Sequence, residues 1–331
     1  MDDPRRNEDA GMDLSSATRH WSSELVRWHS PLYKRLAYAV GAPLLDVHAR
    51  RFLSARTLAL PRLGRVYTQR GFPLEARRTW AARYLQPRGK RLLVLGTGSG
   101  WDLLTWLWLG PRSLIGVDGV SFRTSWGEIQ GWLANWPIVT PEVSFAQADL
   151  GALPLAAESV DGVVSDSVFE HCRDLRGVLL EACRVLRPGG HIYAAYGPLW
   201  SCFGGDHFSG RGGLAYGYQH LAATAPEYAR YVQAHLRPEE DAQTGPRYVA
   251  LDLFSRIDTR GYLALYEELG LEMLELRLGL SSEALAFRRA FPEGVRELCR
   301  RHPARDPDDL VVQIHFVVLR KPVMWRPPCA S

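Results

Sequence analysis

The sequence predicts an α/β fold with a doubly wound parallel sheet that is covered by helices on both faces. From residue 90 onward, short apolar runs alternate with helical patterns, as is typical of strand–helix repeats. The first run ends in a glycine-rich loop, and an aspartate ends the second run. The chain has 331 residues, of which 46% are hydrophobic and 23% charged, so it can bury one large core or two modest ones.

Seven strands are predicted for this sheet, and the last two close it. They cover residues 91–95, 113–117, 143–146, 160–165, 191–196, 271–278 and 311–319. Helices are predicted at 101–109, 175–186 and 260–269, and another follows the second strand and extends to about residue 134. After the fifth strand, six glycines among residues 201–217 interrupt the regular pattern.

These patterns divide the chain into six segments. Residues 1–20 are expected to form a disordered tail, and residues 21–88 a helical lid whose first helix stops at Gly41 and Pro43. The remaining segments are the Rossmann-like core at 89–202, a substrate-pocket insertion at 203–257, the C-terminal helix and closing strands at 258–322, and a tail at 323–331.

The composition argues against several functional classes. The net charge is only +4, and the arginines alternate with acids along the helices, so a nucleic-acid partner is not expected. Five scattered cysteines without a C-x-x-C pair predict neither a disulfide framework nor a metal site. The N-terminal residues are polar and the apolar stretch at 103–109 is short, so we expect no signal peptide, no membrane association and a cytoplasmic location. The oligomeric state stays open.

The glycine loop Gly96-Thr97-Gly98-Ser99-Gly100 joins the first strand to a helix, where open parallel sheets bind their ligands. A dinucleotide-binding loop needs its third glycine one place later, where this chain has Trp101, which argues against NAD and FAD. Asp118 ends the second strand, eighteen residues after Gly100. Its carboxylate is placed to accept both ribose hydroxyls of a nucleoside; an ordinary strand-ending aspartate is the alternative.

Three further motifs follow in register. Asp149-Leu150 ends the third strand, and the fourth strand leads through Asp166-Ser167 to Glu170-His171. Residues 184–190 then read RVLRPGG. With the glycine loop and Asp118, these motifs resemble the class I S-adenosylmethionine-dependent methyltransferases of the small-molecule type, over roughly residues 90–200.

The resemblance implies S-adenosylmethionine as cofactor and methyl transfer to a small metabolite in bacterial specialised metabolism, with S-adenosylhomocysteine as product. It places the glycine loop at the methionine end of the cofactor and Asp118-Gly119 at the ribose. It also places Asp149-Leu150 at the adenine and Asp166-Ser167 beneath the sulfonium. The partner implied is therefore a small-molecule substrate.

One position departs from the family pattern. Val94 stands where the family usually carries an acid that holds the ammonium group of the cofactor. Tyr67 and Arg70 are candidates for holding its carboxylate, with packing and surface roles as the alternatives. His171 is the candidate general base, or else a brace for the following helix. Tyr196, at the end of the fifth strand, is the second candidate catalytic residue, as part of an aromatic pocket wall.

Two questions remain open from the residues alone. Val94 favours a second reaction, similar to that of the azetidine-2-carboxylate synthases. There, a neutral methionine amine attacks its own Cγ and expels methylthioadenosine. A cofactor-binding regulator without catalysis is a third alternative. In the insertion, Asp206 and His207 are candidates for a pair of residues that acts as a catalytic base, for metal ligands, or for a hydrogen-bonded loop.

Overall fold

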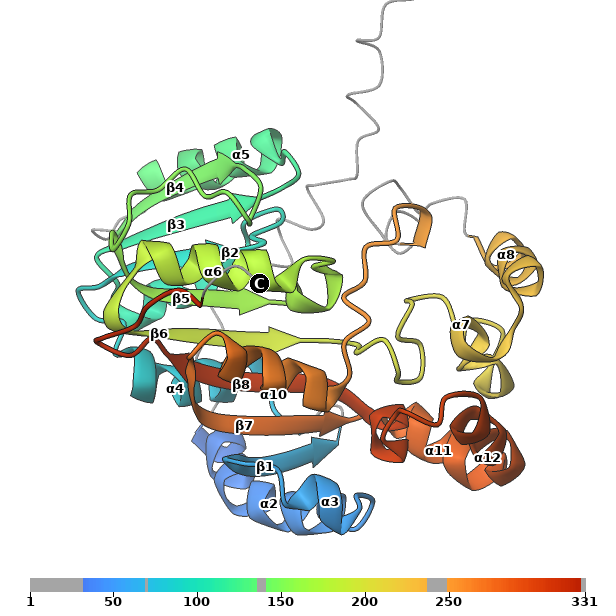
Figure 1. The fold of residues 1–331 in the computed structure, drawn as a ribbon. Helices are drawn as coiled ribbons and strands as arrows, with labels where there is room; N and C mark the ends of the chain where they lie inside the picture. Colours follow the sequence, from blue (N-terminus) through green and yellow to red (C-terminus); the bar gives the residue numbers. More distant parts are fainter. Residues whose placement is uncertain (1–31, 69–70, 136–140, 237–248, 329–331) are drawn as a thin grey trace, which may run out of the picture.

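The computed structural model describes residues 32–68, 71–135, 141–236 and 249–328, which form one sheet with helices on both faces (Figure 1). In chain order the elements are α2 (Leu32–Arg50), α3 (Ala55–Leu58), β1 (Leu63–Thr68), α4 (Leu74–Leu85), β2 (Arg91–Leu95), η1 (Asp102–Leu109), β3 (Ser113–Asp118), α5 (Arg123–Ala134), β4 (Glu142–Gln147), β5 (Val160–Asp166), η2 (Phe169–His171), α6 (Leu175–Val185), β6 (Leu186–Tyr196), η3 (Leu214–Tyr216), α7 (Gln219–Ala222), α8 (Ala225–Ala234), α10 (Thr259–Glu268), β7 (Glu272–Leu280), α11 (Ser282–Ala290), α12 (Pro292–Arg301), η4 (Pro307–Leu310) and β8 (Val312–Arg320).

The sheet has eight strands in the order β1-β7-β8-β6-β5-β2-β3-β4. Strand β8 runs antiparallel to its neighbours β6 and β7, and the other pairs are parallel. The carboxyl ends of all the strands except β8 therefore meet at one edge. The strand order reverses between β2 and β5, and this switch point is where open sheets bind ligands.

Strand β2 shows why both faces of the sheet are covered. Leu92 and Val94 point into a core that contains Trp80 of α4 and Trp106 of η1. Leu93 and Leu95 alternate with them and point into the opposite core, which includes side chains of α6 and α10. A strand that is buried on both faces consists of consecutive apolar residues, and this pattern predicted β2 from the sequence.

A smaller layer, which we call the cap, lies beyond the carboxyl edge of the sheet (Figure 1). It consists of residues 197–236 and 249–257 after β6, and residues 281–311 after β7. Its own apolar cluster includes Tyr218 and Phe287, and the Tyr218 hydroxyl donates to the Leu310 carbonyl over 2.6 Å. The sequence predicted the first cap segment as an insertion, whereas α11 and α12 were assigned to the core segment.

The N-terminal region differs from the helical lid that the sequence predicts. Residues 63–68 form β1, an eighth strand that pairs in parallel with β7. The prediction that the first helix stops at Gly41 and Pro43 is wrong, because α2 continues to Arg50 with Pro43 inside it. Tertiary contacts beyond the proline hold this second half, since Asp46 Oδ1 accepts a 2.7 Å hydrogen bond from the Val66 amide.

Two smaller observations complete the fold. The predicted helix at 101–109 is a 3-10 helix, η1, which ends at Gly110 in the left-handed conformation. Within the four described ranges, none of the helices combines the length and the apolar character that crossing a bilayer requires. The predicted tail at 1–20 and the first residues of the lid lie outside the described residues.

Candidate functional site

A cavity of about 830 Å³ opens where β2, β3 and β5 end. Eight of the residues predicted from the sequence line it: Gly96, Gly98, Asp118, Gly119, Asp149, Leu150, Ser167 and His171. A second hollow, of about 680 Å³, lies between α10 and residues 60–62, near the amino end of β7. It contains none of the predicted site residues, so the chemistry points to the first cavity.

The glycine loop borders the cavity in a fixed conformation. Gly100 has φ +92°, and a Cβ there would lie 2.8 Å from side chains of α5 and β4, so only glycine fits. Gly98 has φ +51°, but a Cβ there would meet nothing within 4 Å, which leaves open space above the backbone. Trp126 Nε1 donates to the Gly98 carbonyl over 2.8 Å, and its ring stacks on Phe145. The loop is thus pinned from α5.

Asp118 faces the loop from the end of β3. Its Oδ2 accepts a 2.8 Å hydrogen bond from the Gly98 amide, and its Oδ1 accepts one of 2.8 Å from the Val120 amide. A carboxylate has about four lone-pair sites, so these two bonds orient the group and leave acceptor capacity toward the cavity. This arrangement suits a diol such as the ribose of a nucleoside.

His171 lies at the far wall of the cavity. Its Nδ1 is 2.9 Å from the Leu253 carbonyl, which can only accept, so Nδ1 carries the proton. Burial lowers the pKa of His171 below its ordinary value, and the imidazole is therefore neutral near pH 7. In this tautomer Nε2 is an acceptor, the form that a general base requires. The ring stacks on His207 of the cap at 5.0 Å.

The segment next to His171 holds a strap of the cap, residues 251–255, at the edge of the cavity. The Glu170 carbonyl accepts a 2.8 Å hydrogen bond from the Ser255 amide. Arg173 Nη2 donates to the Leu251 carbonyl over 3.1 Å. Between these contacts the Leu253 carbonyl accepts from His171, and Leu253 lines the cavity. Arg173 Nη2 also donates to the Asp252 carbonyl over 3.1 Å. Four hydrogen bonds therefore join the strap to residues 170–173, which follow β5.

Glu170 itself is buried, with 3% of its surface exposed. Its Oε1 accepts from the Gly197 amide over 2.9 Å, and Oε2 has no hydrogen-bond partner among the described residues. Burial raises the pKa of Glu170 to about 8, so the carboxyl group is protonated at neutral pH. Glu170 is therefore a neutral acid that binds the Gly197 amide, where the cap begins.

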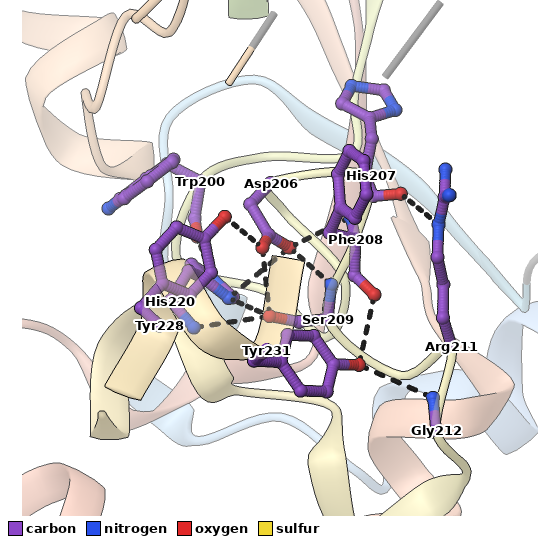
Figure 2. A network of polar contacts seen from close by, with 10 residues as sticks. All are labelled: Trp200, Asp206, His207, Phe208, Ser209, Arg211, Gly212, His220, Tyr228 and Tyr231. Atoms are coloured by element: carbon purple, nitrogen blue, oxygen red, sulfur yellow. Dashed lines mark hydrogen bonds and ion pairs between the residues drawn. The ribbon is translucent and has the colours of Figure 1, made fainter. Parts of the chain in front are cut away.

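Asp206 is the centre of a buried polar network inside the cap (Figure 2). Its Oδ2 accepts hydrogen bonds from the Tyr228 hydroxyl at 2.6 Å and the Ser209 hydroxyl at 3.0 Å. Burial opposes ionisation of Asp206, but His220 and these hydrogen bonds outweigh it and lower its pKa. Of the alternatives for Asp206 and His207, the structure favours the hydrogen-bonded loop for Asp206. The side chain of His207 does not contribute to the two hydrogen bonds above; its ring stacks against the ring of His171.

Several predicted site residues lie elsewhere. Tyr196 is fully buried, with its hydroxyl 2.6 Å from the Tyr266 hydroxyl and 3.0 Å from His315 Nδ1, so it does not line the cavity. Tyr67 is buried too, and its hydroxyl accepts from Arg277 over 2.8 Å. Both side chains found polar partners within the core, which sequence patterns cannot reveal.

The other departures concern the loop and Asp166. The Asp166 carboxylate turns away from the cavity and pairs with Arg78 at 2.6 Å, because α4 presents a buried guanidinium to it. Thr97 is buried and Ser99 exposed, and neither lines the cavity; nor does Gly100, which serves the loop conformation. Arg70 lies outside the described residues.

Sequence reasoning also missed residues that do line the cavity. Cys172, Arg173 and Asp174 follow the Glu170-His171 motif directly, so their place just after this motif was a usable signal. Leu253 comes from the cap, and no local pattern connects it to the glycine loop.

Comparison with known proteins shows similarity to methyltransferases in the part of the chain that forms this site. Residues 93–194 match the model of a methyltransferase domain family. The chain is 36% identical over 194 residues to malonyl-[acyl-carrier protein] O-methyltransferase of Methylococcus capsulatus, covering 56% of this chain and 63% of that protein. It is 33% identical over 126 residues to the ubiquinone/menaquinone biosynthesis C-methyltransferase of Acidiphilium cryptum, covering 36% and 49%. The chain thus spans less than two thirds of these curated relatives.

Solved structures give a more distant likeness. A geranyl diphosphate C-methyltransferase from Streptomyces coelicolor superimposes with a TM-score of 0.44 at 14% identity, over 74% of this chain and 80% of that one. An S-adenosylmethionine-dependent methyltransferase from Mesorhizobium loti gives a TM-score of 0.43 at 18% identity, over 73% and 95%.

Proposed function

The chain belongs to the class I S-adenosylmethionine-dependent methyltransferase superfamily, and on that premise we propose that its cavity binds S-adenosylmethionine and that it methylates a small metabolite. The observation that carries this proposal is the joint placement of Asp118 and the glycine loop. The Gly98 amide orients the carboxylate, and the open space at Gly98 lets a ligand approach the backbone closely.

The lining of the cavity fits the adenosine half of the cofactor. Asp118 has acceptor capacity for two ribose hydroxyls, and Asp149 with Leu150 borders the same cavity beyond it. Phe122 adds an aromatic side chain to this end. When bound, the cofactor supplies an electrophilic methyl group on a sulfonium, and the residues of the chain have to position the acceptor and exclude water.

His171 and the strap carry the second half of the proposal. A neutral imidazole with an acceptor Nε2 suits the removal of a proton from a hydroxyl or amine acceptor. The cap, including the predicted insertion at 203–257, would shape the acceptor pocket. The described part of the predicted N-terminal lid, residues 32–68 and 71–88, contributes no residue to the lining of the cavity, so the cap is the better candidate for covering it. A small acceptor agrees with a cavity that Leu253 of the strap helps to line, and specialised metabolism is the setting we infer for it.

A second candidate, cyclisation of S-adenosylmethionine to azetidine-2-carboxylate, is favoured by one observation. Val94 is 6% exposed and apolar, and Asp166, which lies two residues beyond its register partner Val164, is paired with Arg78. An ammonium group next to Val94 would then find no unpaired carboxylate on β2 or β5, since Asp161 pairs with Arg187. The neutral amine would attack Cγ as the Cγ–S bond breaks, releasing methylthioadenosine and a proton.

One experiment separates these candidates. The purified protein is incubated with S-adenosylmethionine alone, binding is measured by calorimetry, and the products are identified by mass spectrometry. Bound, intact cofactor supports the methyltransferase, whereas methylthioadenosine above the spontaneous background supports the cyclase. Absence of binding refutes both.

Matched variants assign the binding to this cavity. Asp118→Asn should weaken binding about tenfold or more, since one charged acceptor is lost. Asp161→Asn is the control, because Asp161 also accepts a backbone amide, that of Arg91 at 2.8 Å, but lies at the opposite end of β5. Equal affinities of the two variants would refute the role of Asp118.

A further inference from the structure

A buried arginine lies behind the strand end that forms the floor of the cavity. Arg78 of α4 is 1% exposed, and its Nη1 donates to Asp166 Oδ2 over 2.6 Å. Its Nε donates to Thr105 Oγ1 over 3.1 Å, and the guanidinium lies 4.2 Å from the ring centroid of Trp106. The planar group is thus held on three sides, which a lysine could not reproduce.

The Asp166 carboxylate is bound through both of its oxygens. Oδ2 accepts from Arg78, and Oδ1 accepts from the Tyr193 hydroxyl over 3.1 Å. Arg77 Nη1 lies 3.8 Å from Oδ1. Without Arg78, the Asp166 carboxylate would keep only the Tyr193 hydroxyl and the more distant Arg77, so its position depends mainly on Arg78.

Asp166 is also the last residue of β5, and the cavity begins with the next residue. Ser167 has φ +55°, and its amide donates to the Ala195 carbonyl over 2.7 Å. Val168 follows and packs on the first glycine of the loop, since a Cβ on Gly96 would lie 2.2 Å from Val168 Cγ2. Ser167, Val168 and Gly96 all line the cavity, so a shift of Asp166 moves its floor.

We propose that Arg78 is a positioning residue for cofactor binding: it acts through Asp166 to hold Ser167 and Val168 against the glycine loop. This inference rests on the proposed function. Arg78 itself touches neither the cavity nor a reacting atom. The missing acid at Val94 fits this picture, because the buried charge of this face is carried two residues beyond Val164, the register partner of Val94.

The test compares two buried arginines. Arg277 of β7 resembles Arg78, since it is 7% exposed, pairs with Glu275 and lies 4.5 Å from the Trp80 ring. Two strands, β8 and β6, separate β7 from β5, so Arg277 is remote from Ser167. Arg78→Met should weaken S-adenosylmethionine binding about tenfold or more, measured by calorimetry well below the unfolding midpoint, whereas Arg277→Met should stay within about twofold of wild type.

A double-mutant cycle identifies the route. If Arg78 acts through Asp166, Arg78→Met combined with Asp166→Asn should bind no more weakly than the worse single variant. Arg78→Lys, which keeps the charge, should bind with intermediate affinity and provides data if the methionine variant does not fold.

The possible failures are distinct. Equal affinity losses for Arg78→Met and Arg277→Met would show that stability alone is involved and would overturn the inference. Multiplying losses in the double variant would overturn the route through Asp166. A wild-type protein that does not bind S-adenosylmethionine would refute the proposed function, and this inference with it.

Discussion

Glu170 makes the stability of the protein depend on pH, and replacing it with glutamine should remove this dependence. Burial raises the pKa of Glu170 to about 8, while an unfolded glutamate titrates near its ordinary value of 4.5. Between these values the folded state binds one more proton than the unfolded state, so the free energy of unfolding falls as the pH rises. From about pH 6 to about pH 8 the loss is about 2 kcal/mol.

The assay is urea denaturation of wild type and Glu170→Gln at both pH values. Glutamine keeps the shape and an acceptor for the Gly197 amide, so the variant should lose about 2 kcal/mol less than wild type over this range. Glu275→Gln is the control. Burial opposes ionisation of Glu275, but hydrogen bonds from Arg277, Trp80 and Tyr84 outweigh it and lower its pKa. Glu275 is therefore ionised in both states throughout this range, and its variant should follow the wild-type pH dependence. Parallel profiles for wild type and Glu170→Gln would refute the reasoning.

Three further predictions concern the loop, the base and the aromatic core. Gly100→Ala should destabilise the protein by about 1–3 kcal/mol and weaken cofactor binding, since its φ and its neighbours exclude a Cβ. Gly127→Ala, in the interior of α5 with nothing within 4 Å, should stabilise it by about 0.5–1 kcal/mol in the same denaturation assay. His171→Asn should reduce turnover with an acceptor about 100-fold and change cofactor affinity less than threefold; unchanged turnover would rule out the base. Tyr196→Phe should cost about 1–3 kcal/mol of stability through unpaired core groups, without weakening cofactor binding.

The features that sequence analysis predicted correctly are those encoded locally. The loop at 96–100 directly follows β2 and Asp118 ends β3, so the parallel pairing of these two strands brings the loop and Asp118 together. Strand β1 was missed because its partner, β7, begins at Glu272, so no neighbouring pattern marks residues 63–68 as part of a sheet. The pairing of Asp166 with Arg78 was missed for the same reason, since a charge on α4 decides where a strand-end carboxylate turns.

The strap explains why the proposed acceptor side of the site is the part least visible in the sequence. The proposed cofactor side is lined by residues at or just after the ends of β2, β3, β4 and β5, and these strands follow one another in the chain. The proposed acceptor side includes Leu253 of the strap, which comes from the cap and is held by Glu170, His171 and Arg173. Because His171 is bonded to this strap, the candidate base and the pocket wall move together. Substitutions in the strap should therefore change acceptor selectivity and turnover while cofactor affinity, which depends on the strand ends, stays the same.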